Sequence, residues 1–239
     1  MTRIIGHRGA RNEAPENTIP GFTLAQTNGC VAFELDVRLS RDFQLMVFHD
    51  KTLDRTTEHL GCLSDFDAAE LNRMDARGKH LWPYPCVIPS LEQVFDAVPK
   101  TIDWQLEVKP SSLFKMKLLA RKLDQFIAFH KRSDVRITVT SSSEWFLKEI
   151  KQINPKTKTG LVAEYIGEQS VYKCRSLACD LLVLNHKLCD QKTLQHAKDA
   201  GIEVSVWTVN DLARMRELSS MGVDSIITDI PTQALSQFK

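Results

Sequence analysis

Short apolar runs alternate along the chain with longer amphipathic segments. The apolar runs have the length of strands and predict β-structure at 3–6, 31–37, 45–48, 103–108, 135–140, 159–162, 181–184, 203–208 and 225–228. The amphipathic segments predict helices at 18–27, 91–97, 113–130, 144–153, 192–200 and 211–221. Strands that are separated by helices favour a parallel sheet, because parallel neighbours need a crossover connection.

The number of strand–helix units suits a TIM (β/α)8 barrel that forms a single domain over residues 1–239. A doubly wound open sheet is the alternative. That fold usually carries a glycine-rich phosphate turn after its first strand, whereas this chain has His7-Arg8-Gly9-Ala10 there. The segment 54–89 is rich in turn-forming residues and interrupts the alternation of strands and helices. We therefore expect a small insertion after the second strand, packed over one end of the barrel.

Charge and cysteine content limit the partners and the cellular compartment that we expect for this protein. A net charge of +1 without a Lys/Arg run argues against a nucleic-acid partner. No apolar stretch suggests a secretory leader or a membrane span. The six cysteines are scattered, with no C-x-x-C pair, so we expect reduced, mostly buried thiols in a cytoplasmic protein and no cysteine-ligated zinc. Oligomeric state cannot be read from these features.

The first predicted strand runs into His7 and Arg8, and a helix with Asn17 or Thr18 as its N-cap follows. This arrangement delivers an imidazole and a guanidinium to the C-terminal end of a buried strand. A histidine at such a position is often only satisfied by backbone groups, so His7 alone does not establish a catalytic site.

Carboxylates follow on the second and third parallel strands. Period-two alternation places Glu34 and Asp36 on one face of their strand, and Glu107 and Lys109 share a face of theirs. If that face of the strand pointed to solvent, a single pair of charged residues such as Glu34 and Asp36 would need no further explanation. If the face points into a barrel, neighbouring carboxylates repel one another and favour a bound divalent cation.

Two further strand ends carry candidate side chains. His49 ends the apolar run 45–48; Asp50 adjoins it, although neighbours on an extended strand face opposite ways. Trp207 is either core or one wall of a substrate pocket. Active sites of TIM barrels gather at the C-terminal ends of the strands, where all these groups are expected. Three carboxylates without cysteine suit Mg²⁺ or Ca²⁺, and two imidazoles suit proton transfer. Arg8 and Lys109 suit a phosphate, so the set together indicates metal-assisted phosphodiester cleavage.

These motifs, in this order, resemble the glycerophosphodiester phosphodiesterase family over nearly the whole chain. The resemblance is carried by His7-Arg8-Gly9 with Pro15-Glu16-Asn17-Thr18, Glu34-x-Asp36, His49-Asp50, Glu107-x-Lys109, Leu53-Asp54-Arg55-Thr56-Thr57, Ile88-Pro89-Ser90-Leu91-Glu92, Trp207-Thr208-Val209-Asn210 and Thr228-Asp229-x-Pro231. Two positions depart from the family pattern. Phe43 stands where a glycine is usual, and Gln105 where many relatives carry asparagine.

The resemblance implies hydrolysis of small glycerophosphodiesters to sn-glycerol 3-phosphate and an alcohol. It implies an acid/base pair at His7 and His49, and one divalent cation, Mg²⁺ or Ca²⁺ with Mn²⁺ as a further candidate. The remaining implied roles are metal ligation by Glu34, Asp36 and Glu107, phosphate binding by Arg8 and Lys109, and binding of metal or substrate glycerol by Glu16. Water and the substrate's own 2-hydroxyl both remain open as the nucleophile. A lysophospholipase D activity in the same site and a non-catalytic phosphate-ester binding protein are the alternatives.

Overall fold

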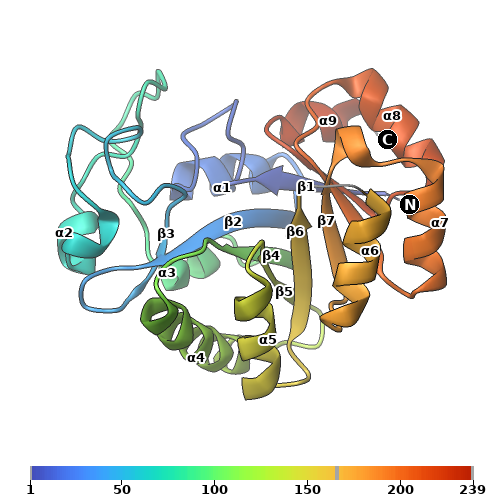
Figure 1. The fold of residues 1–239 in the computed structure, drawn as a ribbon. Helices are drawn as coiled ribbons and strands as arrows, with labels where there is room; N and C mark the ends of the chain where they lie inside the picture. The colour runs from blue at the N-terminus through green and yellow to red at the C-terminus, as the bar shows by residue number, and fades with distance from the viewer. Residues whose placement is uncertain (1, 165–166, 238–239) are drawn as a thin grey trace.

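The structure is a computed structural model that describes residues 2–164 and 167–237. Met1 and residues 238–239, at the ends of the expected domain, lie outside the described residues. Eight parallel strands form a closed barrel, because β1 pairs with both β2 and β9 (Figure 1). The strands are β1 (Arg3–His7), β2 (Ala32–Leu39), β4 (Asp103–Val108), β5 (Arg136–Ser141), β6 (Lys158–Ala163), β7 (Leu181–Asn185), β8 (Glu203–Trp207) and β9 (Ser225–Thr228). The predicted TIM barrel is confirmed.

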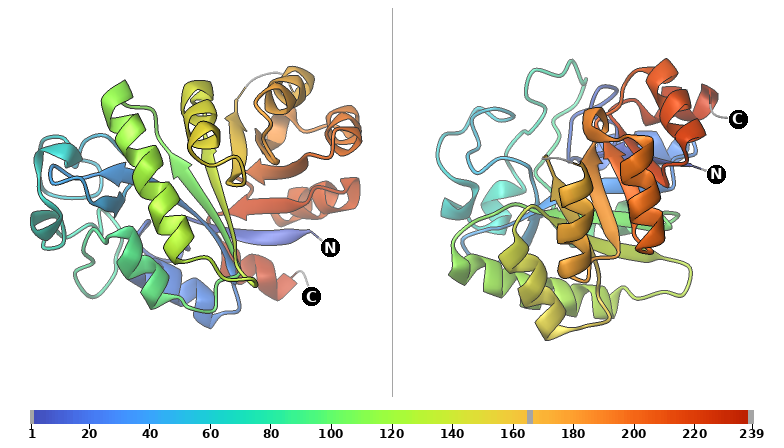
Figure 2. Two further views of the ribbon diagram at one scale, coloured as in Figure 1. Left: turned by 90° about the horizontal axis from the view of Figure 1, so that it is seen from below. Right: turned by 45° about the vertical axis from the view of Figure 1, so that its right-hand side comes forward.

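Helices cover the outside of the barrel, as the two views of Figure 2 show. They are α1 (Ile19–Thr27), α3 (Leu91–Ala97), α4 (Leu113–Phe129), α5 (Glu144–Ile153), α6 (Gly167–Ser176), α7 (Gln191–Asp199), α8 (Leu212–Met221) and α9 (Pro231–Gln237). α6 and α9 were not predicted, because each buries few apolar side chains and so has little hydrophobic periodicity. No helix within the described ranges combines the length and hydropathy that crossing a membrane requires.

The expected strand 45–48 is not a barrel strand. β3 (Leu45–Val47) folds back antiparallel on the end of β2, with Val37 opposite Val47. Phe43 makes the turn with a φ of 61°, a left-handed conformation that explains why glycine is usual at this position. After β3 the chain leaves the barrel and returns at α3.

The segment between β3 and α3 is the predicted insertion, at the left of Figure 1. It contains the short helices η1 (Leu63–Asp65) and α2 (Ala68–Leu71). A separate apolar cluster holds it together, formed by Met46, Phe48, Leu53, Leu63, Leu71, Met74, Ala76 and Ile88. The insertion is therefore anchored by burial of apolar side chains, including Met46 of β3, and a short backbone bridge between Met46 and Ser90 joins its end to that strand.

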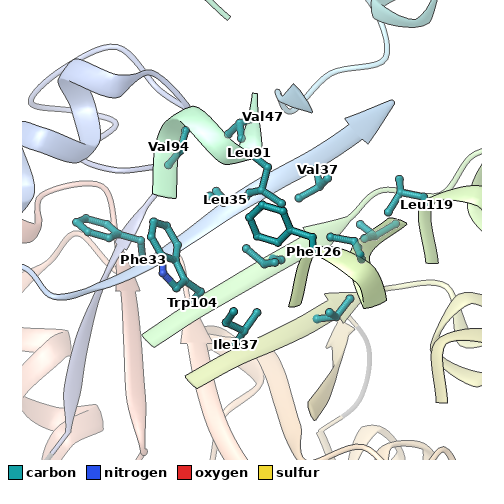
Figure 3. Packing of buried hydrophobic residues seen from close by; sticks show 14 of the residues in the cluster. Phe33, Leu35, Val37, Val47, Leu91, Val94, Trp104, Leu119, Phe126 and Ile137 are labelled. Carbon is teal, nitrogen blue, oxygen red and sulfur yellow. The ribbon is translucent and has the colours of Figure 1, made fainter. Parts of the chain in front are cut away.

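The main core fixes which side chains of β2 and β4 face inward. Phe33, Leu35 and Val37 of β2 pack with Trp104 outside the barrel, against α3 and α4 (Figure 3). Because strand side chains alternate, the intervening residues of β2 point into the barrel. All six cysteines are free thiols and five of them are buried, in agreement with the prediction.

Candidate active site

His7 ends β1 inside the barrel and contacts the last barrel strand. Its Nδ1 lies 2.5 Å from Oδ1 of Asp229, and its Nε2 lies 3.8 Å from Oε2 of Glu34. Asn210 donates from Nδ2 to Oδ2 of Asp229 at 2.7 Å, which fixes that carboxylate. Since a carboxylate can only accept, the imidazole proton lies on Nδ1 and the lone pair on Nε2 is available for chemistry.

The pKa of His7 reflects two opposing effects. Burial lowers the pKa of His7, and this outweighs the hydrogen bond to Asp229, which raises it. Sequence reasoning noted the end of the last strand but gave Asp229 no role. The closed barrel supplies the missing information, because it places β9 beside β1 although His7 and Asp229 are 222 positions apart.

Glu34, Asp36 and Glu107 converge inside the barrel, as the strand periodicity predicts. The register pairs Asp36 with Glu107, and one oxygen from each of the three carboxylates lies within 4.8 Å of the others. Burial, Asp36 and Glu107 together raise the pKa of Glu34 well above its usual range. Oε1 of Glu34 is buried without a hydrogen-bond partner in the described structure. Carboxylates that are this close, dry and incompletely paired can hold a hard divalent cation.

Two cations partly neutralise this cluster. Lys109 Nζ lies 2.6 Å from Oε1 of Glu107 and 3.1 Å from Oδ1 of Asp36. Arg8 Nε lies 3.1 Å from Oδ2 of Asp36, and Asn17 donates to the same oxygen at 2.9 Å. Burial alone would raise the pKa of Asp36, but Arg8 and Lys109 hold it well below its usual range. Asp36 is thus the permanently charged member of the cluster.

The turn after β1 is shaped for these contacts. Arg8 and Asn17 both have positive φ, at 50° and 55°. Non-glycine residues hold that conformation only where the surroundings impose it, and such residues concentrate at functional sites. Thr18, not Asn17, is the N-cap of α1, with its hydroxyl accepting from the amide of Gly21. Asn17 is thereby free to orient Asp36.

Glu16 lies outside the carboxylate cluster, among arginines. Its carboxylate contacts Arg8 at 2.8 Å, Arg11 at 3.1 Å and Arg55 at 2.7 Å. Burial alone would raise the pKa of Glu16, but the hydrogen bond from Arg55 and the charge of Arg8 lower it to about 2. These contacts give Glu16 the geometry of a residue that positions guanidinium groups. Arg11 and Arg55 were not among the expected site residues, and their contacts could not be read from local patterns.

His49 lies just beyond β3, at the edge of the insertion. Its Nδ1 lies 2.7 Å from Oδ1 of Asp50, which in turn binds Arg55. Burial lowers the pKa of His49, while the charge of Asp36 acts in the opposite direction. The neighbouring side chains can face one another because β3 ends at Val47 and residues 49 and 50 are not extended strand.

One cavity of about 330 Å³ joins these groups. His7, His49 and Glu107 line it, and so do Arg8, Arg11, Glu34, Gln105, Lys109, Glu164 and Trp207. Trp207 is half-buried and donates from its indole Nε1 to the carbonyl of Val183 at 3.3 Å, so it forms a fixed wall. Gln105 reaches across the barrel to Ser205 at 3.3 Å. Both predicted histidines therefore line the same space as Glu34 and Glu107 of the acidic cluster.

Comparison with known proteins agrees with this geometry. The model of the glycerophosphoryl diester phosphodiesterase family matches residues 7–233. A glycerophosphodiester phosphodiesterase of Caldanaerobacter subterraneus is 31% identical over 96% of this chain and 95% of its own. A lysophospholipase D of Rattus norvegicus is 24% identical over 98% of this chain and 85% of its own.

Solved structures share the fold across the whole chain. A phosphodiesterase of Oleispira antarctica, solved with its product sn-glycerol-3-phosphate, superposes with a TM-score of 0.90 at 26% identity and covers 100% of this chain and 97% of its own. A glycerophosphodiester phosphodiesterase of Agrobacterium tumefaciens gives a TM-score of 0.84 at 26% identity and covers 99% of this chain and 100% of its own. The barrel, the cavity at its centre and the sequence matches lead to one assignment: the chain belongs to the glycerophosphoryl diester phosphodiesterase family of phosphoric diester hydrolases.

Proposed function

We propose that the protein cleaves glycerophosphodiesters into sn-glycerol 3-phosphate and an alcohol, using a bound divalent cation and two histidines. The observation that carries this proposal is that His7, His49, Glu34 and Glu107 line one cavity, with the buried carboxylate of Asp36 beside the other two. The product in the Oleispira antarctica structure supports the choice of substrate class. The substrate would be a small molecule such as glycerophosphocholine, glycerophosphoethanolamine or glycerophosphoglycerol.

Glu34, Asp36 and Glu107 would hold the cation. The donor set fits, because one oxygen from each carboxylate lies within 4.8 Å of the others and Oε1 of Glu34 lacks any partner in the described residues. Oxygen-only ligation suits Mg²⁺ or Ca²⁺, with Mn²⁺ as a third candidate. When bound, such an ion supplies positive charge that offsets the charge of the phosphate.

His7 and His49 would transfer the two protons of the reaction. Asp229 and Asp50 each occupy the Nδ1 side of one ring, so both histidines present Nε2 to the cavity. Burial lowers the pKa of both imidazoles, which favours the neutral form that a general base requires. One histidine would deprotonate the nucleophile, whether water or the substrate's 2-hydroxyl, and the other would protonate the leaving alkoxide.

Arg8 and Lys109 would bind the phosphate, and Trp207 would form a wall of the substrate pocket. The side chains of Arg8 and Lys109 both contact Asp36 of the carboxylate cluster, and both line the cavity. Glu16 would act on the substrate only indirectly, by holding Arg8 and Arg11 in place. We further propose that residues 1–239 form one domain. We also propose a cytoplasmic location, because six free thiols are typical of a reducing compartment.

A lysophospholipase D activity is the second candidate, and one surface feature favours it. The ring of Phe43 packs edge-on against Phe114 with centroids 6.3 Å apart, and Leu113 adjoins them. These side chains are 39%, 67% and 57% exposed respectively, close to the ends of β2 and β4. Such a patch could receive an acyl chain near this end of the barrel.

Release of the alcohol from a panel of diesters tests the proposal, with sn-glycerol 3-phosphate as the second product of the short diesters. Glycerophosphocholine, glycerophosphoethanolamine and glycerophosphoglycerol would be compared with lysophosphatidylcholine, each with Mg²⁺, Ca²⁺, Mn²⁺ or a chelator. We expect turnover of the short diesters with at least one ion and none with the chelator. Faster choline release from lysophosphatidylcholine would favour the second candidate, and binding without turnover on every diester would contradict both.

A further inference from the structure

A second cavity, of about 390 Å³, adjoins the catalytic one. It lies between the end of β2, the insertion and the start of α4. Lys109 lines both cavities, so the two spaces meet at the side chain that borders the metal cluster. Val37, Leu39, Leu63 and Leu119 form its apolar floor.

The polar lining of this second cavity is cationic. Arg38, Lys51 and Lys115 line it together with Lys109, and no carboxylate does so among the residues that the structure describes. Lys109 is already paired with Glu107 and Asp36. The other three make no ion pair within residues 2–164 and 167–237. Three cations that form no ion pair with a described residue thus line one concave space.

Arg38 supplies the guanidinium of this set. It is half-buried, and its Nε donates to the carbonyl oxygen of His49 at 2.8 Å, while its terminal nitrogens bond to no described residue. Burial costs the guanidinium part of its hydration, and among the described residues Asp36, Asp50 and Glu107 act on it only from beyond ion-pair distance. A buried guanidinium that lacks a partner is stabilised by an anionic ligand.

Neutral donors complete the lining. Ser64, Ser111 and Ser112 lie around the cavity, and Ser112 is the N-cap of α4. The N-terminus of this 17-residue helix adds a partial positive charge. Hydroxyl groups, a guanidinium and ammonium groups together match the oxygens of a phosphate or a carboxylate.

We propose that this second cavity binds an anionic group, a phosphate or a carboxylate, on the leaving alcohol of the diester. The inference rests on the proposed function and adds a substrate preference to it. Two observations connect the cavity with the reaction: Lys109 borders both spaces, and Arg38 holds the backbone of the catalytic segment at His49. Arg38, Lys51 and Lys115 are then specificity residues for diesters that carry a second negative charge.

Paired substrates test the proposal. One is glycerophosphoglycerol, whose leaving alcohol is neutral, and the other carries an additional phosphate on that glycerol. The variant is Lys51→Gln with Lys115→Gln, and the matched control is Lys117→Gln, an exposed lysine of α4 that does not line the cavity. For the phosphorylated substrate we expect KM to rise about ten-fold in the double variant, about three-fold for each charge removed. Neither kcat nor the KM for glycerophosphoglycerol should change, and the control should match the unmodified protein.

A binding measurement separates failure of this inference from failure of the proposed function. Calorimetric titration with inorganic phosphate should show an affinity that falls about ten-fold in the double variant and not in the control. Unchanged phosphate binding would overturn the proposal even if no diester is hydrolysed. Weaker phosphate binding with unchanged kinetics on the phosphorylated substrate would also overturn it, because the cavity would then take a free anion and not the leaving alcohol.

Discussion

Asp229 determines how His7 presents its reactive nitrogen, and Asp229→Asn is the substitution that tests this. The amide has the shape of the carboxylate but no charge. It can turn its nitrogen toward Nδ1 of His7, which would move the imidazole proton to Nε2 and block the side that faces the cavity. The change is buried, so solvent cannot replace the lost contact: the side chains of His7 and Asp229 are only 9% and 7% exposed.

The size of the effect follows from the contact. With Nδ1 and Oδ1 2.5 Å apart, the two charge centres lie about 4 Å apart, and opposite charges at that distance attract by about 4 kcal/mol at an effective dielectric constant of 20. That energy corresponds to a factor of about 10³ in the stability of the imidazolium ion. We therefore expect kcat to fall by about 10² to 10³ with glycerophosphocholine as substrate.

The pH profile supplies a second readout. Asp229 raises the pKa of His7, so its removal lowers that pKa further. The limb of the rate profile that belongs to His7 should move to lower pH, whichever proton His7 transfers. The matched control is Asp50→Asn at the more exposed partner of His49, where we expect a loss nearer ten-fold. An Asp229→Asn protein that keeps a third of its turnover, with an unshifted profile and a native unfolding transition, would refute the reasoning.

Three further substitutions probe the charges and the strain around the site. Glu16→Gln should destabilise the fold by about 2–3 kcal/mol at pH 7 in urea unfolding. Because the pKa of Glu16 is lowered from 4.5 to about 2, this difference in stability should persist above pH 4.5 and vanish as the pH falls through 2. A pH-independent difference in stability would contradict the reasoning. With a chelator present, Glu34→Gln should be more stable than the unmodified protein by about 1 kcal/mol at pH 8. This gain in stability should shrink toward pH 5, because a carboxyl group with a raised pKa costs the folded state stability as the pH rises. Equal stability across that range would argue against repulsion within the carboxylate cluster. Phe43→Gly should raise stability by about 0.5–1 kcal/mol in thermal unfolding because it relieves a left-handed φ, and a loss would mean that the edge contact with Phe114 outweighs the strain.

The sequence was most informative where a property is local. Alternation along β2 and β4 correctly placed Glu34, Asp36 and Glu107 on the inner face, because side-chain direction in a strand depends only on position. The barrel followed from the repeated strand–helix rhythm. The strand at 45–48 was correctly predicted, but its orientation was not, since an apolar run does not reveal whether its partner is parallel or antiparallel.

The contacts that orient the site were beyond local patterns. Asp229 reaches His7 only because the barrel closes, and Asn17 reaches Asp36 only because of a left-handed turn. The arginines around Glu16 come from the first loop and from the insertion. Each of these interactions depends on the relative placement of distant segments, which no periodicity encodes.

The central claim is that hydrolysis depends on a divalent cation held by Glu34, Asp36 and Glu107. The most direct test measures bound metal and turnover of glycerophosphocholine in the same samples, for the unmodified protein and for Glu107→Gln, after chelation and after return of Mg²⁺, Ca²⁺ or Mn²⁺. We expect the unmodified protein to lose activity on chelation and to regain it as one ion binds per chain, and we expect Glu107→Gln to show neither recovery nor tight binding. Full turnover by a protein shown to contain no metal would contradict the account.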